Sequence, residues 1–440
     1  MSRYVTRKTP GDTAWFTHDR FGMFIHFGLY AMGGRGEWIR SQEYISDAEY
    51  QKFFEEFNPD KLDVRAWAKS AKAAGMKYAV LTAKHHDGFC LFDTKYTDFN
   101  VMNTPYGKDI VRDYVDAMRE EGIRVGLYYS LVDWHHPDYT LDQWHPMRNT
   151  PDPAGFNRGR DMHRYAEYMR NQLTELMSNY GKIDILWLDF SMEKDPAFEK
   201  SHPCITTGKG RNEWESEKLI ETVRKLQPDI LIDNRADIEQ DIFTPEQYLP
   251  RKWLTHPETG ELVVWEACHT MSCSWGYYRN GENNKTPEML IQALVRAVSL
   301  GGNLLVNIGP NGRGAIDRRD AAGLSAYAEW MDDHARSIYG CTMADAEFRA
   351  PEGCILTQSE DGKRLYVHLV EYPFHLLELH GFAGKVKYAQ FLDDGSEIAF
   401  SEGGSKHISI GREEGDDLLV LYIPDRRPPV ILPVIELILK

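Results

Sequence analysis

Short apolar segments alternate with helix-like segments from residue 20 to residue 310, and this alternation constrains the fold more than any other feature. The apolar segments are rich in β-branched and aromatic residues and are apolar almost throughout, as expected of parallel strands buried on both faces. We predict seven such strands: Phe21–Gly28, Lys77–Lys84, Arg124–Ser130, Ile183–Phe190, Ile230–Arg235, Leu262–Cys268 and Asn303–Gly309.

The segments between these strands carry helix signals. Ser46 and Glu49 form a capping box ahead of a stripe of aromatic residues, and Asp109 precedes a second apolar stripe. Further helices are predicted at 160–180, 213–227, 286–300 and 315–339. Repeated strand–helix units predict an α/β fold, a (β/α)8-like barrel of the TIM type over residues 1–342. Seven strands leave one of the eight missing, irregular or wrongly assigned. A doubly wound open sheet is the alternative, although no GxGxxG follows the first strand.

The pattern changes after Gly340, where short strand-like segments are separated by turn signals such as Asp361-Gly362. This pattern predicts a C-terminal antiparallel β-sandwich over residues 343–440. The predicted strands are Cys354–Ser359, Arg364–Glu371, His375–Leu379, Val386–Leu392, Glu397–Ser401, His407–Ile410, Leu418–Pro424 and Val430–Leu439.

Charge and composition exclude several classes of protein. The net charge of −16 opposes binding to nucleic acid or to an anionic membrane, and no segment approaches the ~18–20 apolar residues of a membrane span. The six cysteines lack CxxC spacing, which favours free thiols in a reducing compartment over a zinc site. No apolar h-region follows the basic N-terminus. We therefore expect a cytoplasmic protein, although a secreted chain trimmed of its leader would look the same.

Polar and aromatic side chains gather where the predicted strands end, which in a barrel is the active face. They include His26, Lys84, His85, His86, Asp87, Tyr128, Tyr129, Ser130, Trp187, Asp189, Asp233, Asn234, Arg235, Trp265, Glu266 and Asn307. Any one of them is compatible with a structural network, but so many strands ending this way is hard to explain by chance. Carboxylates, imidazoles and aromatic rings suit carbohydrate chemistry, because cleaving an acetal needs two carboxyl groups.

A series of motifs runs through residues 10–340. They are Trp15–Gly28, Gly36–Trp38, Thr82–Phe89, Gly126–Ser130, Leu186–Asp189, Asn234-Arg235, Thr244–Glu246, Trp265-Glu266, Ser274–Tyr277 and Gly302–Pro310. In content and order they resemble the α-L-fucosidases of glycoside hydrolase family 29, and in particular the broad-specificity branch. The resemblance implies a retaining, exo-acting enzyme that removes terminal α-L-fucose by double displacement, without a cofactor.

The resemblance also implies roles for individual residues. Asp189 falls on the position of the catalytic nucleophile, although a strand-end Asp is also suited to capping the next helix. Sugar-binding positions are implied at His26, Glu37, Trp38, His85, His86, Tyr129, Trp187, Arg235 and Trp275. Phe27 and Trp275 are expected to line the pocket for the C6 methyl group.

Metal ligation is the alternative for the adjacent histidines His85 and His86. Adjacent imidazoles on a strand point to opposite faces, and no second cluster has metal-ligand spacing. We therefore expect no metal.

The general acid/base is harder to place. The resemblance favours Glu246, in the segment Asp241–Glu246. Thr-Pro-Glu is also an ordinary helix start, with Thr as the cap and Pro at the first position. Glu266 is the competitor, because it follows a Trp at a strand end, but it is equally suited to holding a binding residue in place. Glu239 is a third candidate.

Two other functions stay open on the sequence alone: a non-catalytic carbohydrate-binding protein on the same fold, and an exo-glycosidase for a related sugar such as a galactoside. The intact Trp187-Leu188-Asp189 segment disfavours the first. The expected partner is a fucosylated oligosaccharide or glycoconjugate, with neither nucleic acid nor membrane, and a homo-oligomer stays open.

Overall fold

Seven parallel strands form the central sheet in the computed structural model, which describes residues 3–402 and 417–440. They are β1 (Phe21–Ile25), β2 (Tyr78–Lys84), β3 (Arg124–Ser130), β4 (Ile185–Asp189), β5 (Leu231–Ile232), β6 (Glu266–Thr270) and β7 (Asn303–Ile308). Their order in the sheet is β5-β4-β3-β2-β1-β7-β6. The first strand therefore pairs with both the second and the last, which is the order of a barrel opened between β5 and β6.

Residues 242–246 lie between β5 and β6 and supply the eighth strand in irregular form. Parallel bridges pair Asp233 with Ile242, Phe243 with Trp265, and Glu246 with Cys268. Pro245 has no N–H to donate to a ladder, although its carbonyl accepts a hydrogen bond from the Cys268 N–H at 3.1 Å. The sheet is thereby closed into the predicted barrel, and the eighth strand follows β5 with no crossover helix.

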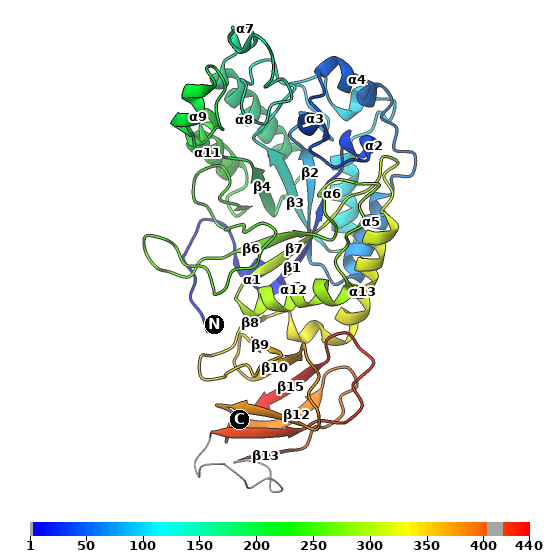
Figure 1. Cartoon of the computed structure of the whole chain (residues 1–440), viewed down its shortest axis with the longest axis vertical. Helices are drawn as coiled ribbons and strands as arrows, with labels where there is room; N and C mark the ends of the chain where they lie inside the picture. The colour runs from blue at the N-terminus through cyan, green and yellow to red at the C-terminus, as the bar shows by residue number, and fades with distance from the viewer. Residues whose placement is uncertain (1–2, 403–416) are drawn as a thin grey trace.

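The α-helices of the described residues lie around this sheet and beyond its ends (Figure 1). They are α1 (Ala14–Asp19), α2 (Tyr30–Gly33), α3 (Ile39–Gln42), α4 (Asp47–Glu55), α5 (Val64–Ala73), α6 (Ile110–Glu120), α7 (Pro153–Asn157), α8 (Met162–Asn179), α9 (Pro196–Ser201), α10 (Arg211–Trp214), α11 (Ser216–Leu226), α12 (Pro287–Ser299) and α13 (Arg318–His334). The capping box of Ser46 and Glu49 opens α4, and Asp109 caps α6, both as predicted. Helix α5, which Asp63 caps, was not predicted.

Two apolar layers lie on the two sides of the barrel strands, because successive side chains of a strand point to opposite faces. The outer layer packs the strands against the helices. The inner layer fills the barrel with Phe16, Phe24, Tyr78, Val80, Tyr128, Ile185, Trp187, Leu231, Ile242, Val264, Cys268 and Leu305. Ile242 belongs to the inner layer, so the irregular strand completes the interior of the barrel.

A β-sandwich follows the barrel, as predicted. A five-stranded sheet has the order β12-β15-β10-β9-β8, and a three-stranded sheet the order β11-β14-β13; the pairings in both are antiparallel. The strands are β8 (Cys341–Met343), β9 (Cys354–Ser359), β10 (Arg364–Leu369), β11 (Leu376–His380), β12 (Val386–Phe391), β13 (Phe400–Glu402), β14 (Leu418–Tyr422) and β15 (Val434–Leu439). The predicted strand His407–Ile410 lies outside the described residues, and the division between 342 and 343 stays a prediction.

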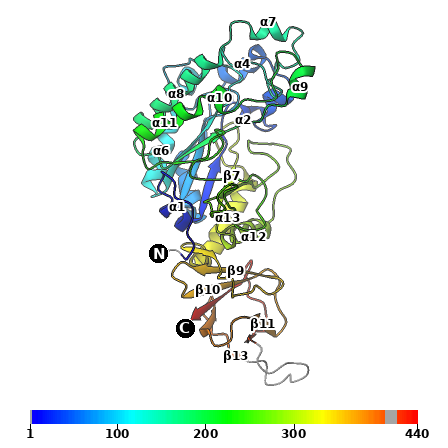
Figure 2. The ribbon, with the colours of Figure 1, turned by 90° about the vertical axis from the view of Figure 1, so that its left-hand side faces the viewer.

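The sandwich lies at one end of an elongated molecule, next to α12 and α13 (Figures 1 and 2). Helix α12 contacts β8 and β9, and the Trp330 indole N–H on α13 donates to the Leu432 carbonyl at 3.2 Å. All six cysteines are free thiols. Over residues 3–402 and 417–440, none of the helices combines the length and the apolarity that a membrane crossing requires.

Asp241 fastens the irregular strand to β5. Its buried carboxylate accepts hydrogen bonds from the backbone N–H groups of Gly11 and Ile232, both at 2.8 Å, and pairs with Arg224. In the Asp241→Ala variant, we expect the N–H groups of Gly11 and Ile232 and the guanidinium of Arg224 to lose their buried partner. Breaking a buried pair from one side costs about 3–5 kcal/mol, so urea titration should show a fall of that order in the free energy of unfolding.

Glu217→Ala is the matched control for this substitution. It removes an exposed carboxylate that pairs with Arg211 at the surface, and exposed pairs contribute little. The control should unfold at the wild-type urea concentration. An Asp241→Ala variant that does the same would contradict the fastening role.

Candidate active site

A cavity of about 480 Å³ lies at the carboxyl ends of the barrel strands. It is lined by Phe24, His26, Trp38, His85, His86, Tyr128, Trp187, Asp189, Phe190, Ser191, Asn234, Arg235, Asp237, Thr244, Glu246 and Trp275. The structure therefore brings together nine residues for which a catalytic or sugar-binding role was predicted from the sequence: His26, Trp38, His85, His86, Trp187, Asp189, Arg235, Glu246 and Trp275. Glu37, Tyr129, Glu239 and Glu266 do not line this cavity.

One guanidinium nitrogen joins two carboxylates inside the cavity. Arg235 Nη1 lies 2.9 Å from Asp189 Oδ1 and 2.7 Å from Glu246 Oε2. These two contacts limit the distance between the two oxygens to at most about 5.6 Å, near the ~5–5.5 Å separation of retaining glycosidases and below the ~6.5–9.5 Å of inverting ones. Burial alone lowers the pKa of Arg235, but the neighbouring anionic groups, Asp189 foremost, outweigh it and raise the pKa above its usual value.

Other contacts fix this arrangement. The Tyr128 hydroxyl donates to Asp189 Oδ2 at 2.7 Å, and burial raises the pKa of Tyr128, so the phenol keeps its proton. Arg235 lies 4.4 Å from the ring centroid of Trp187 and donates from Nε to Thr244 Oγ1 at 2.9 Å.

The chain turns sharply just after each carboxylate. Phe190 has φ 84° and Gln247 has φ 60°, a region that residues other than glycine occupy rarely. Unusual backbone of this kind gathers at functional sites.

Tyr128 occupies the place that was predicted for Tyr129. The Tyr129 side chain points to the opposite face of β3, where its hydroxyl donates to Gln172 at 2.7 Å. Tyr128 pairs in register with Trp187 on β4, and both belong to the inner layer. The sugar-binding position implied for Tyr129 is therefore wrong in its placement, because Tyr128 and not Tyr129 lines the cavity. The pairing register between β3 and β4, which puts Tyr128 beside Trp187, identifies the correct face.

The expected position of Phe27 is also wrong. Its ring packs in the outer layer against Phe57 and Trp67. Phe24 lines the cavity instead, with its ring 5.1 Å from Trp187 and 5.8 Å from Trp275 between centroids. An apolar wall is present as expected, but a different phenylalanine provides it.

Glu37 supports the site from outside the cavity. Its buried carboxylate accepts hydrogen bonds from Gly276 N–H at 2.8 Å and Ser274 Oγ at 2.9 Å, and so holds the loop that carries Trp275. Burial raises the pKa of Glu37. Glu37 therefore contacts this loop and does not line the cavity, where a sugar-binding position was predicted for it.

Neither competitor for the acid/base role lies at the cavity. Glu266 is fully buried in the barrel, where it accepts a hydrogen bond from the Tyr78 hydroxyl, and burial raises its pKa to about 7. Glu239 pairs with Arg7 and with His256. The alternative interpretation of Thr244–Glu246 as a helix start is also wrong, because these residues belong to the irregular strand.

His85 and His86 both line the cavity, contrary to the expectation that they point to opposite faces. They follow Lys84, the last residue of β2, so strand alternation does not apply to them. Their ring centroids are 4.0 Å apart. Across the described ranges 3–402 and 417–440, no group of three or more His, Cys, Asp or Glu side chains is arranged to hold a metal ion.

Asn307 sets the proton position on His26. The Asn307 amide nitrogen donates to the Trp275 carbonyl at 2.7 Å, which directs its amide oxygen at His26 Nδ1, 2.6 Å away. His26 therefore carries its proton on Nδ1 and presents an unprotonated Nε2. Burial lowers the pKa of His26 to about 3, although this hydrogen bond opposes the shift.

Ser130 does the same for His86. The single proton of the Ser130 hydroxyl is donated to the Val132 carbonyl at 2.7 Å, so the hydroxyl oxygen accepts from His86 Nδ1, also at 2.7 Å. The Nε2 of His86 is then an acceptor and lies 3.8 Å from Asp189 Oδ2. Burial lowers the pKa of His86 to about 3 and also lowers that of His85, so the three imidazoles that line the cavity are neutral.

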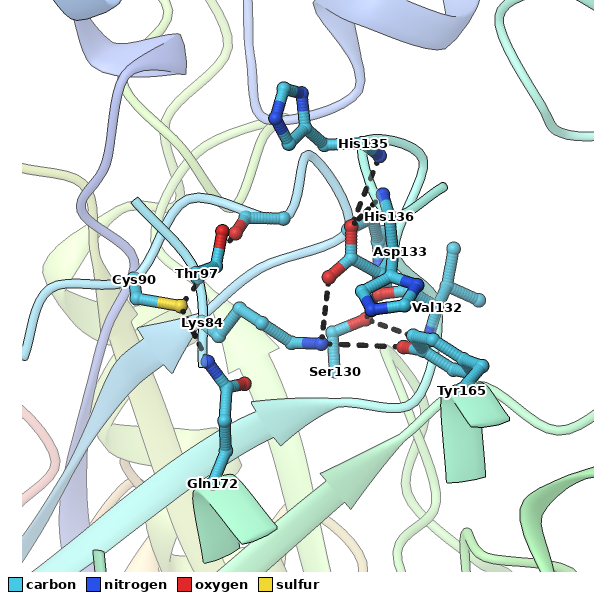
Figure 3. Close-up of polar contacts among 12 residues, drawn as sticks. Lys84, Cys90, Thr97, Ser130, Val132, Asp133, His135, His136, Tyr165 and Gln172 are labelled. Atoms are coloured by element: carbon cyan, nitrogen blue, oxygen red, sulfur yellow. Dashed lines mark hydrogen bonds and ion pairs between the residues drawn. The ribbon is translucent and has the colours of Figure 1, made fainter. Parts of the chain in front are cut away.

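A buried ion pair between Lys84 and Asp133 fixes the end of β2, just before His85 and His86 (Figure 3). Lys84 Nζ lies 3.2 Å from Asp133 Oδ2 and 3.3 Å from the Tyr165 hydroxyl. Asp133 Oδ1 in turn accepts hydrogen bonds from the backbone N–H groups of His135 and His136, at 3.0 and 2.9 Å. The end of β2 is thereby fixed to the segment that follows β3.

Comparison with known proteins points in one direction. The family profile described as Alpha-L-fucosidase matches residues 5–336. An alpha-L-fucosidase of Dictyostelium discoideum is 26% identical over 366 residues, which span 76% of this chain and 72% of the relative. The tissue alpha-L-fucosidase of Homo sapiens is 28% identical over 360 residues, spanning 74% of this chain and 69% of the relative.

Solved structures agree with these relatives. Alpha-L-fucosidase isoenzyme 1 from Paenibacillus thiaminolyticus is 43% identical with a TM-score of 0.87, and the match covers 97% of this chain and 98% of that one. A GH29 alpha-L-fucosidase from Bacteroides thetaiotaomicron, trapped as a covalent intermediate with 2-fluoro-fucosyl fluoride, is 27% identical with a TM-score of 0.80. That match covers 100% of this chain and 99% of the other.

We predict that His26 and His86 stay neutral between pH 5 and pH 8, because burial places the pKa of each at about 3. A depressed histidine pKa means that the folded protein binds this proton only near pH 3, whereas the unfolded chain binds it near about 6.5. Nitrogen NMR of histidine-labelled protein should show both rings protonated at Nδ1, with shifts that do not change over this range.

The variants Asn307→Ala and Ser130→Ala assign the two signals. The urea-unfolded protein is the control, in which every histidine should titrate near its ordinary value. A His26 or His86 signal that titrates between pH 6 and 7 in the folded protein would contradict the assignment.

Proposed function

This chain belongs to the family of α-L-fucosidases, and we propose that Asp189 is its nucleophile and Glu246 its general acid/base. The reaction is the hydrolysis of terminal α-L-fucose with retention of configuration. The observation that carries this assignment is the single nitrogen of Arg235 in contact with both carboxylates. Their limited separation suits attack by one carboxylate and proton transfer by the other.

In the first step, an oxygen of Asp189 attacks the anomeric carbon of fucose. The bond from this carbon to the leaving oxygen breaks, and Glu246 donates its proton to that oxygen, so that a glycosyl ester forms on Asp189. Tyr128 and Arg235 hold the carboxylate of Asp189 in position before the attack. Glu246 is 40% exposed in its side chain, which gives it room to turn from Arg235 toward a leaving group.

In the second step, Glu246 removes a proton from water while the water oxygen attacks the same carbon. The ester bond breaks, Asp189 returns to its ionised form, and Glu246 regains its proton. Two displacements on one carbon return the original configuration. The neighbouring charge of Arg235 favours release of Asp189 as an anion.

The sugar is recognised by neutral groups. The unprotonated Nε2 atoms of His26 and His86 accept hydrogen bonds from sugar hydroxyls, a role that follows from the proton positions set by Asn307 and Ser130. Phe24 and Trp275 form an apolar wall suited to the C6 methyl group. This wall favours a 6-deoxy sugar, because a hydroxyl in its place would lose a hydrogen-bond partner.

We predict that Glu246→Ala separates substrates by their leaving groups. An aryl α-L-fucoside with an activated leaving group needs little protonation, so its first step should stay fast, whereas hydrolysis of fucosyl oligosaccharides should fall by about 10²–10⁴-fold. Azide should accelerate turnover of the aryl substrate by replacing water in the second step. Its product should be α-L-fucosyl azide, identified by proton NMR.

Glu266→Ala is the comparison, because it removes a carboxyl group buried outside the cavity. This variant should affect aryl and oligosaccharide substrates alike. If Glu266→Ala alone shows the dependence on the leaving group and the rescue by azide, then Glu266 and not Glu246 is the acid/base.

A further inference from the structure

A second groove adjoins the active-site cavity. It has a volume of about 320 Å³ and shares Trp38 and Trp275 with the cavity as common walls. Its other sides include Arg35, Tyr278 and Gln247. Trp38 and Trp275 therefore line both the proposed fucose site and the groove.

The groove is lined by the residue that follows the proposed proton donor in the chain. Glu246 is the proposed proton donor, so the glycosidic oxygen must lie next to it. Gln247, the next residue in the chain, lines the groove. A sugar joined to this oxygen therefore has the groove within its reach.

Backbone hydrogen bonds join two of the segments that form the groove. Residues 34–36 and 277–279 run side by side: the Gly36 N–H donates to the Tyr277 carbonyl at 3.1 Å, and the Arg279 N–H to the Gly34 carbonyl at 2.9 Å. Glu37 holds the loop of Trp275 through two further hydrogen bonds. Such a surface binds a ligand without first having to be ordered.

The charges and donors of the groove suit a neutral polyol. Arg35 is paired with Glu43 through two hydrogen bonds and donates a third to the Gly33 carbonyl. A guanidinium has five N–H donors, so two of those on Arg35 are left by these contacts for hydroxyl groups. Because Glu43 balances the charge, an anionic ligand gains little here, whereas the Tyr278 and Trp38 rings offer flat faces to a sugar.

We propose that this groove is a subsite for the leaving-group portion of the substrate, and that it binds the neutral sugar residue to which fucose is attached. The proposal rests on the proposed function, because it uses Glu246 to locate the leaving oxygen. It deepens that function by assigning Arg35 and Tyr278 to the recognition of an oligosaccharide rather than of fucose.

The test compares two kinds of substrate on the same variants. For each protein, kcat/KM is measured with p-nitrophenyl α-L-fucoside, with 2′-fucosyllactose and with 3-fucosyllactose. The kcat/KM for the trisaccharide that is cleaved better is then divided by the kcat/KM for the aryl fucoside. We expect Tyr278→Ala and Arg35→Ala each to lower this ratio by about tenfold or more. Tyr278→Phe, which keeps the ring, should keep most of the ratio.

A chemical block of the groove gives a second measurement that leaves Arg35 and Tyr278 unchanged. Cys273 is exposed and lines the groove, and Cys204 is the other exposed thiol. In a Cys204→Ser background, alkylation with N-ethylmaleimide should lower the trisaccharide-to-aryl ratio. The same treatment of the Cys204→Ser, Cys273→Ser double variant is the control and should not change the ratio.

The outcomes separate this proposal from the proposed function. An unchanged ratio in both the substitutions and the alkylated protein would overturn the subsite while leaving the fucosidase intact. Cleavage of the aryl fucoside without cleavage of either trisaccharide by the wild-type protein would overturn it as well. Failure of the wild-type protein on all three substrates would instead contradict the function itself.

Discussion

The guanidinium of Arg235 is the interaction on which the site depends. Arg235 follows β5 in the chain, and its guanidinium lies over the ring of Trp187 on β4. The guanidinium also donates to Thr244 of the irregular strand and contacts both carboxylates. Two carboxylates this close would repel each other in a partly buried cavity. The cation removes that repulsion and at the same time fixes the distance between them. The separation of the carboxylates that the proposed retaining mechanism needs therefore depends on the position of the Arg235 side chain.

The position of Glu246 follows from the way in which the barrel closes. A regular strand followed by a crossover helix would have carried the chain away from β5, whereas residues 242–246 cross directly into the gap beside β6. Asp241 anchors this crossing at its start, and Pro245 interrupts the ladder near its end. The proposed acid thus stands on an irregular strand with a half-exposed side chain, while Asp189 stands on a regular one. That difference suits a group that must meet both a leaving group and water.

Much of this could be predicted from the sequence, and the failures have physical causes. Buried strands and capped helices are local patterns, so the barrel and the sandwich were predictable, as were nine residues of the cavity. The eighth strand could not be located in the sequence, because a segment paired only by isolated bridges has no periodic pattern of apolar residues. Tyr129 was chosen over Tyr128 because a shift of one residue reverses the face of a strand. The groove beside the cavity could not be predicted, because its residues come from segments far apart in the sequence and meet only in the fold.

Trapping the covalent intermediate shows most directly whether Asp189 attacks the sugar. The protein would be incubated with 2-fluoro-fucosyl fluoride, digested with a protease and mapped by mass spectrometry. A 2-fluoro-fucosyl group is expected on the peptide that contains Asp189, with the ester on that residue. A label on Glu246 or on any other carboxylate would contradict this assignment, as would an enzyme that retains configuration without forming any labelled peptide.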